Sequence, residues 1–271
     1  MAQINPTMGD LKGNASLIRH YARRAANDDA DLVVFPEMAI TGYPPVDLLP
    51  PRETRPPSGT RRPDQEEFVR LNKQLVLELA QELHDIVAVV GFVDYDESNL
   101  YNGAAVMDGG HVLGVVHKTL LPTYDIFDEL RYFVPGRENH PLKITIGGRQ
   151  VSLGISICED IWDRQIGYPV QVVDMLCEEG AQIIVNLNAS PFHNKIRNIR
   201  LRILKDKASR LGVPILYANM VGGQDELVFD GQSLAVDSKG QLIGIGKQFE
   251  EDLVLADIDM PSGRGSSGQV T

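Results

Sequence analysis

Helical and strand-like patterns alternate along most of this chain. Apolar residues recur at helical spacing in three long segments, residues 11–25, 68–83 and 196–211. Short apolar runs, each of the length of a buried strand, lie between these segments, and residues 233–258 read as three further strands. Alternation of this kind is typical of α/β folds, in which helices cover sheets around a shared core. A length of 271 residues fits one large domain of this class better than two.

Charge and composition exclude several classes of function. The chain carries 26 Lys and Arg residues against 37 Asp and Glu residues, and its net charge of -11 makes it a poor candidate for binding nucleic acids or anionic membranes. No apolar run approaches the roughly 20 residues needed to span a bilayer. The N-terminus lacks the basic and apolar regions of a signal peptide. Two cysteines make no disulfide framework in a chain this long, so we expect a cytoplasmic protein.

Three of the expected strands lead into a side chain that is useful for catalysis. Glu37, Lys118 and Cys158 each come at the end of an apolar run, and a turn follows. Side chains on a turn that a rigid element holds are often functional. Taken alone, Glu37 and Lys118 also read as ordinary surface charges, and Cys158 as a small core residue. Cys177 lies in a helical segment and is expected to be a core residue without a chemical role.

Longer motifs around these residues resemble a known family. FPEMAITGYPP, HKTLLPTYDIFDELRYF and SICEDIW, in this order, resemble the Glu–Lys–Cys segments of the nitrilase (carbon–nitrogen hydrolase) superfamily. GYPPVDLL, YDIFDELRYF, NLNASPFH and VGGQDELVFDGQS are similar to the N-terminal glutaminase domain of glutamine-dependent NAD synthetases. The resemblance runs from Ala2 to about Asp259. It implies a four-layer αββα sandwich of the nitrilase type, with the hydrolase domain at residues 1–260.

The resemblance implies hydrolysis of the glutamine side-chain amide through a thioester on Cys158. Glu37 would act as the general base, and Lys118 would stabilise the oxyanion together with the backbone N–H that follows the cysteine. A lysine near the thiol would also favour the thiolate, which is the nucleophilic form. Glu129, in DELRYF, resembles a second active-site glutamate that orients the lysine. An ion pair between Glu129 and Arg131 is the alternative.

The resemblance also implies a set of residues that bind the substrate. Tyr124, Glu159 and Ser190 would hold the amino acid moiety of glutamine, and Lys195 would bind its carboxylate. The family usually places a glycine directly before this basic residue, and an asparagine stands there in this chain. Arg200 is therefore the alternative for the carboxylate.

The implied partner is a synthetase domain, in cis or in trans, that uses the ammonia to amidate deamido-NAD to NAD. The SGGxDS loop of that domain is absent from this sequence. ATP and Mg²⁺ are therefore expected only at that domain, with no cofactor in this chain. The histidines at 111, 117, 140 and 193 show no paired metal-ligand spacing, so no metal site is expected. A homo-oligomer is expected.

Several alternatives remain open on the sequence. MAQINP corresponds to the second half of the family's first strand, and the Gly/Ser-rich residues 261–271 are typical of a flexible tail or a truncated linker. The chain could be a truncation, a split subunit or a stand-alone amidase acting on another small amide or carbamoyl compound. A non-enzymatic scaffold is a further class. The proline-rich residues 50–64 are expected to form a mobile surface loop.

Overall fold

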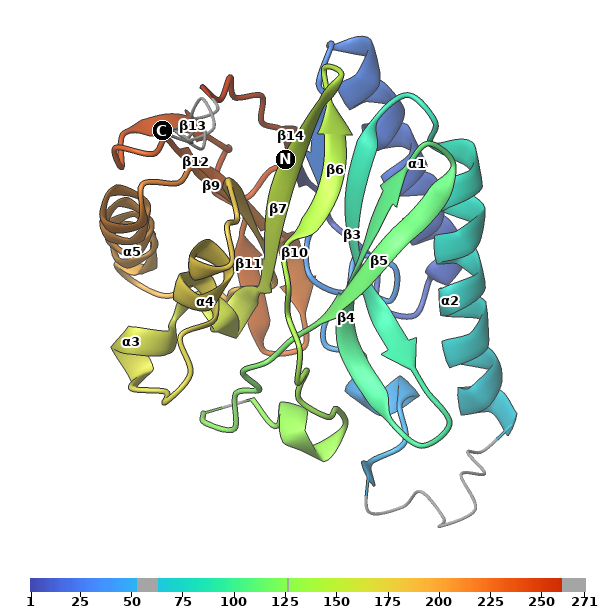
Figure 1. Cartoon of the computed structure of the whole chain (residues 1–271). Helices are drawn as coiled ribbons and strands as arrows, with labels where there is room; N and C mark the ends of the chain where they lie inside the picture. The colour runs from blue at the N-terminus through green and yellow to red at the C-terminus, as the bar shows by residue number, and fades with distance from the viewer. Residues whose placement is uncertain (53–62, 126, 260–271) are drawn as a thin grey trace, which may run out of the picture.

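The computed structural model describes residues 1–52, 63–125 and 127–259. Two main sheets face each other across an apolar layer, and helices cover the outer face of each sheet (Figure 1). This arrangement confirms the expected four-layer αββα sandwich.

The smaller main sheet has four strands in the order β2-β3-β4-β5. They are β2 (Leu32–Val34), β3 (Val87–Tyr95), β4 (Leu100–Asp108) and β5 (His111–His117). β2 and β3 are parallel, and the other neighbours are antiparallel. The helices α1 (Leu11–Asn27) and α2 (Pro63–Glu82) cover its outer face. Asp10 caps α1, because its side chain accepts a hydrogen bond from the backbone N–H of Gly13.

The larger sheet has six strands in the order β13-β12-β9-β8-β7-β6. They are β6 (Leu142–Ile146), β7 (Arg149–Ile157), β8 (Ile183–Asn188), β9 (Ile215–Asn219), β12 (Leu234–Val236) and β13 (Leu242–Ile245). The central strands β7, β8 and β9 are parallel, β6 and β12 run antiparallel to them, and β13 is antiparallel to β12. The helices α4 (Val172–Glu178) and α5 (Ile196–Leu211) pack on its outer face.

Shorter elements complete the described chain. β1 (Ala2–Gln3) pairs with β14 (Asp252–Leu253), and β10 (Val221–Gln224) forms a ribbon with β11 (Leu227–Asp230). The short helices are α3 (Asp163–Ile166), η1 (Val46–Leu48), η3 (Glu129–Arg131) and η4 (Cys158–Ile161), the last three of the 3-10 type.

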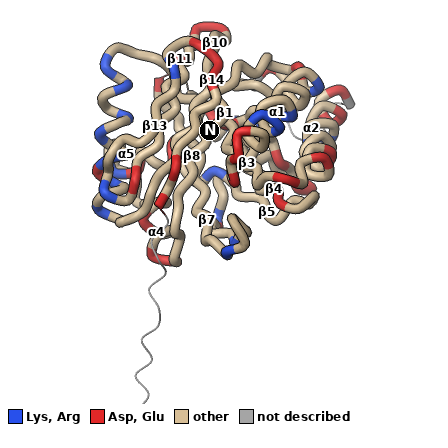
Figure 2. Tube along the Cα trace, turned by 90° about the horizontal axis from the view of Figure 1, so that it is seen from above, with Lys and Arg blue, Asp and Glu red and all other residues tan. Residues whose placement is uncertain are grey.

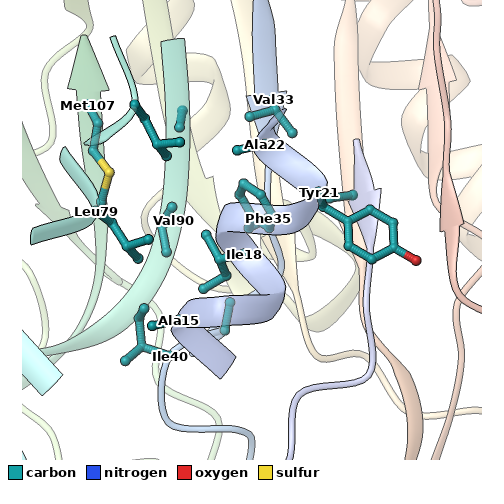
Figure 3. Close-up of a cluster of buried hydrophobic side chains, with 14 of the residues drawn as sticks. Ala15, Ile18, Tyr21, Ala22, Val33, Phe35, Ile40, Leu79, Val90 and Met107 are labelled. Carbon is teal, nitrogen blue, oxygen red and sulfur yellow. The ribbon is translucent and has the colours of Figure 1, made fainter. Parts of the chain in front are cut away.

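Successive residues of the inner strands face two different apolar layers. In β2, Val33 belongs to the layer under α1 and α2, whereas Val34 belongs to the layer between the sheets. Figure 3 shows the first layer, in which Ile18 of α1 and Leu79 of α2 lie against the sheet. Packing on both faces holds the end of such a strand in place.

Some expected boundaries differ from the structure. β6 was not among the expected strands, because it is a half-exposed edge strand with charged and polar residues between its apolar ones. The predicted loop at 50–64 falls largely on residues 53–62, which lie outside the described ranges. Its last two residues belong to α2 instead, since a proline is well tolerated in the first turn of a helix. The predicted tail at 261–271 also lies outside the described ranges.

Charged side chains gather on the outer helices. Figure 2, seen from above, shows Lys and Arg residues along α5, and Arg197, Arg202 and Lys205 of this helix are exposed. Within the three described ranges, no helix has the length and apolar character that crossing a membrane requires.

The ends of three strands define one region of the molecule. Residues that follow β2 and β5 come from the smaller sheet, and residues that follow β7 come from the larger one. In Figure 1 the segments that follow β5 and β7 lie in the lower half of the view. Side chains from both sheets can therefore meet there.

Candidate active site

Glu37 lies on a sharp turn that is fitted against β3. The turn passes directly over Gly91, where a Cβ atom would stand 2.3 Å from the Pro36 carbonyl oxygen and 2.5 Å from the Met38 nitrogen. A residue with a side chain at position 91 would displace this turn. The backbone N–H of Ile40 also donates to the Gly91 carbonyl at 3.2 Å. The Glu37 side chain is fully buried as a result.

Three donors from different parts of the chain fix the Glu37 carboxylate. Its Oε1 accepts from Asn102 Nδ2 on β4 at 2.6 Å and from Lys118 Nζ at 2.7 Å. Its Oε2 accepts from the backbone N–H of Ala189, just after β8, at 3.0 Å. Both sheets therefore contribute to one carboxylate.

Lys118 lies between two buried carboxylates. Its Nζ is 2.7 Å from Glu37 Oε1 and 2.8 Å from Glu129 Oε1, and the side chain is 1% exposed. Burial alone would lower the pKa of Lys118, but the carboxylates of Glu129 and Glu37 outweigh it and raise this pKa well above its usual value. The ammonium is therefore permanently charged at physiological pH.

Lys118 and Arg131 were the two expected partners of Glu129, and the structure shows the contact with Lys118. Tyr43 donates its hydroxyl to the same Glu129 oxygen at 3.0 Å. Burial raises the pKa of the Glu129 carboxyl, and the Lys118 ammonium opposes that shift. Arg131, the alternative ion-pair partner, has its guanidinium over the ring of Tyr132, 5.7 Å from the ring centre.

Cys158 follows β7 and begins η4 in a strained conformation. Its φ is +42°, which is uncommon for a residue with a side chain and occurs where the surroundings impose it. The residue is partly exposed. Burial of the thiol and the Glu37 carboxylate raise the pKa of Cys158 well above its usual value, although Lys118 acts to lower it. The expected thiolate stabilisation by Lys118 is therefore outweighed, and the resting thiol is protonated.

Glu159 and Tyr124 lie together next to Cys158 in the fold. The Tyr124 hydroxyl donates to Glu159 at 2.9 Å, and the hydroxyl of Tyr168 contacts the same carboxylate at 3.0 Å. Burial raises the pKa of Glu159, and Lys118 and the two hydroxyls oppose the shift. The result is a carboxylate held in place beside the thiol.

The remaining expected residues are arranged less compactly. Ser190 adjoins Ala189, whose N–H binds Glu37, so it lies beside the cluster. Arg200 is fully buried and committed elsewhere, because it pairs with Asp230 at 2.7 Å and donates to the Ser190 carbonyl at 2.7 Å. Lys195 is exposed, with a φ of +74° at the start of α5. Neither Lys195 nor Arg200 makes a hydrogen bond or ion pair with Glu159 in the described ranges.

Sequence reasoning missed three of the side chains that build this site. They are Asn102, Tyr43 and Tyr168, which bind Glu37, Glu129 and Glu159 respectively. Asn102 offered a signal, since it is a polar residue inside an otherwise apolar strand and such residues need a buried partner. Nothing in the local pattern marked Tyr168.

A pocket of about 400 Å³ lies against Glu129. It is mostly apolar, and its lining includes Tyr43, Phe127, Tyr132 and Phe133. Over the described part of the chain, no cluster of three or more His, Cys, Asp or Glu side chains is arranged to hold a metal ion.

Comparison with known proteins identifies the family and the fold. A family model described as carbon–nitrogen hydrolase matches residues 1–265. The glutamine-dependent NAD(+) synthetase of Thermotoga maritima is 41% identical over 263 residues, which make up 96% of this chain and 42% of that relative. The chain thus spans less than half the length of that curated relative.

Two solved structures show the same fold. The glutamine-dependent NAD+ synthetase of Acinetobacter baumannii, in complex with ADP, matches with a TM-score of 0.79 and 34% identity, over 94% of this chain and 44% of that one. A mutant amidase from Nesterenkonia sp. AN1 matches with a TM-score of 0.75 and 25% identity, over 95% of this chain and 91% of that one. In that amidase, acrylamide is attached by Michael addition at the active-site cysteine.

Proposed function

Because this chain belongs to the carbon–nitrogen hydrolase family, we propose that it hydrolyses the side-chain amide of glutamine through a thioester on Cys158. The observation that carries the proposal is the buried Lys118 ammonium, held at 2.7 Å from Glu37 and 2.8 Å from Glu129. Burial and the Glu37 carboxylate raise the pKa of the nearby Cys158 thiol, which favours its neutral form. A neutral thiol is a weak nucleophile and needs a base. Glu37 is that base.

The first half of the reaction forms the thioester. The Cys158 sulfur attacks the amide carbon while its proton passes to the Glu37 carboxylate. The Lys118 ammonium and the backbone N–H of Glu159 stabilise the negative oxygen that develops. The carbon–nitrogen bond then breaks, and Glu37 returns the proton to the leaving nitrogen, which departs as ammonia.

The second half regenerates the enzyme. Water attacks the thioester carbon and gives one proton to Glu37 as the bond to sulfur breaks. Glutamate leaves, and Glu37 returns the proton to the Cys158 sulfur. No group is consumed, since one carboxylate serves as base and acid in turn.

Glutamine is held by the residues that surround the thiol. Glu159 pairs with the substrate ammonium, and the support for this role is that Tyr124 and Tyr168 hold its carboxylate. Ser190, which adjoins Ala189, helps to hold the amino acid moiety, and the exposed Lys195 is the residue proposed for the substrate carboxylate. Arg200 positions Ser190 rather than substrate, because its guanidinium already binds Asp230 and two backbone carbonyls.

We further propose that the released ammonia serves a synthetase domain, in cis or in trans, that amidates deamido-NAD to NAD. The support is the similarity to glutamine-dependent NAD synthetases, of whose length this chain spans 42% to 46% in the first four relatives. ATP and Mg²⁺ are needed only at that domain. On this proposal the isolated chain releases ammonia from glutamine but makes no NAD.

A stand-alone amidase is the second candidate. The observation that favours it is the match to the Nesterenkonia amidase along 91% of that protein. A panel of glutamine, small aliphatic amides and carbamoyl compounds distinguishes the two. The amidase reading predicts rapid hydrolysis of a small amide while glutamine is ignored.

We expect a glutamine-mimicking electrophile to label Cys158 and to leave Cys177 unmodified. The base and the oxyanion site act only at Cys158, whereas burial raises the pKa of Cys177 to about 11 and keeps it protonated. Intact mass followed by peptide mapping reads the site, and Cys158→Ala should abolish labelling. Modification confined to Cys177 would remove Cys158 from its assigned role.

A further inference from the structure

Asp160 is a buried carboxylate that the proposed chemistry does not use. It lies in η4, two residues after Cys158, and its exposed fraction is 0%. Burial raises the pKa of Asp160 to about 7, although three backbone N–H groups oppose that shift. Burying a carboxylate lowers the stability of the fold unless its oxygens are hydrogen-bonded, and perturbed pKa values cluster at functional sites.

The contacts of Asp160 join two segments of the chain. Its Oδ1 accepts from the backbone N–H groups of Thr119 at 3.1 Å and Leu120 at 2.8 Å. Its Oδ2 accepts from the backbone N–H of Ile157 at 3.0 Å. Thr119 and Leu120 directly follow Lys118, and Ile157 directly precedes Cys158. One carboxylate therefore ties the backbone beside the ammonium to the backbone beside the thiol.

The backbone hydrogen bonds of Lys118 itself join it to β4 and to Gly136. Its N–H donates to the Asn102 carbonyl at 2.8 Å, and its carbonyl accepts from Gly136 at 2.8 Å. Neither bond involves the larger sheet, which carries Cys158. In the described ranges, the hydrogen bonds between residues 117–122 and residues 156–162 all end on Asp160. Cys158, whose φ is +42°, lies inside the turn that the bond from Ile157 to Asp160 closes.

We propose that Asp160 is a positioning residue that sets the distance and orientation between the Lys118 ammonium and the Cys158 thiol. It touches neither substrate nor the reacting atoms. The proposal rests on the thiol chemistry assigned to Cys158 under the proposed function. A displacement of about 1 Å between reacting groups is enough to lower turnover by about a hundredfold.

Two variants separate the geometry from the charge. Asp160→Asn keeps the size but replaces one acceptor oxygen by a donor, so at least one of the three bonds is lost. Asp160→Glu keeps the charge and moves both oxygens by one methylene group. Asp237→Asn is the matched control, because Asp237 also accepts from two backbone N–H groups, those of Lys239 and Gln241, in a turn before β13.

The first measurement is glutamine hydrolysis per folded active site, with the folded fraction taken from urea unfolding, because iodoacetamide also labels Cys158 in unfolded chains. We expect kcat to fall by about a hundredfold in Asp160→Asn and about tenfold or more in Asp160→Glu, with KM within about threefold of the original. Asp237→Asn should keep the original kcat. A purely structural role would instead lower the folded fraction and leave kcat per site unchanged.

The second measurement is the rate of Cys158 alkylation by iodoacetamide against pH, which does not depend on glutamine. Because Asp160→Glu preserves the charge, a shift of at least about half a unit in the apparent pKa of the thiol reports a changed distance to Lys118 and Glu37. If the unmodified protein released no ammonia from glutamine, the proposed function would fail. The alkylation rates would still show whether Asp160 positions the thiol. If Asp160→Asn does not fold, Asp160→Glu decides. A folded Asp160→Glu with unchanged kcat and unchanged thiol pKa overturns the proposal.

Discussion

Glu37→Gln is expected to lower kcat for glutamine hydrolysis by about a thousandfold while KM stays within about threefold. The amide side chain at position 37 has nearly the shape of the original carboxylate. It cannot take the Cys158 proton or return it to the leaving nitrogen. Because Glu37 acts in the transition state, its replacement should lower turnover and change substrate binding little. Steady-state ammonia release measures the effect, and a thermal melt shows whether the variant is folded.

Glu37→Gln should make the Cys158 thiol easier to ionise, although it lowers hydrolysis. The Glu37 carboxylate raises the pKa of Cys158, second only to burial, so its removal should lower that pKa. Alkylation by iodoacetamide should then begin at lower pH than in the original protein, although hydrolysis fails. Glu82→Gln is the control, since Glu82 is a surface carboxylate paired with Arg19 and should be silent in both assays. Near-full hydrolysis by a folded Glu37→Gln would mean that another group is the base.

Lys118→Met is expected to lower kcat by about a hundredfold or more and also to destabilise the fold. Removing the ammonium leaves the carboxylates of Glu37 and Glu129 buried without their cation, which typically costs about 3–5 kcal/mol. Urea unfolding measures the second effect. Adding Glu129→Gln to Lys118→Met should recover part of the stability but none of the activity, which separates the two roles of the lysine.

The stability of Lys118→Met should also depend on pH. Burial raises the pKa of the Glu129 carboxyl in the folded protein, and loss of the ammonium removes the interaction that opposes this shift. The folded state then binds a proton that the unfolded chain releases above its ordinary glutamate pKa of about 4.3. Stability should therefore fall as pH rises from about 5 toward 8. A flat profile over that range would show that Glu129 carries no such proton.

The strand ends that carry Glu37, Lys118 and Cys158 could be recognised in the sequence, because each follows a short apolar run. Their partners could not. Asn102 reaches Glu37 across 65 residues, and that contact depends on strand register. Tyr168 lies nine residues after Glu159, and its contact depends on how the chain turns around α3.

The α5 helix shows a second limit of sequence reasoning. Arg200 was considered only as a substrate ligand and Lys207 was not considered, yet both side chains are buried. Their spacing from Ile196 and Ile203 places them on the same side as the apolar stripe, and that spacing was a usable signal. Their carboxylate partners, however, come from other elements that no local pattern identifies.

Cleavage of glutamine through a covalent intermediate on Cys158 can be observed directly. The purified protein is mixed with glutamine and quenched in acid within the first turnover, and intact mass and mapped peptides are measured alongside ammonia. We expect a glutamyl group on the Cys158 peptide, with ammonia released in equal amount before glutamate appears. Ammonia release from glutamine without an adduct on Cys158, or an adduct on Cys177 alone, would contradict this mechanism.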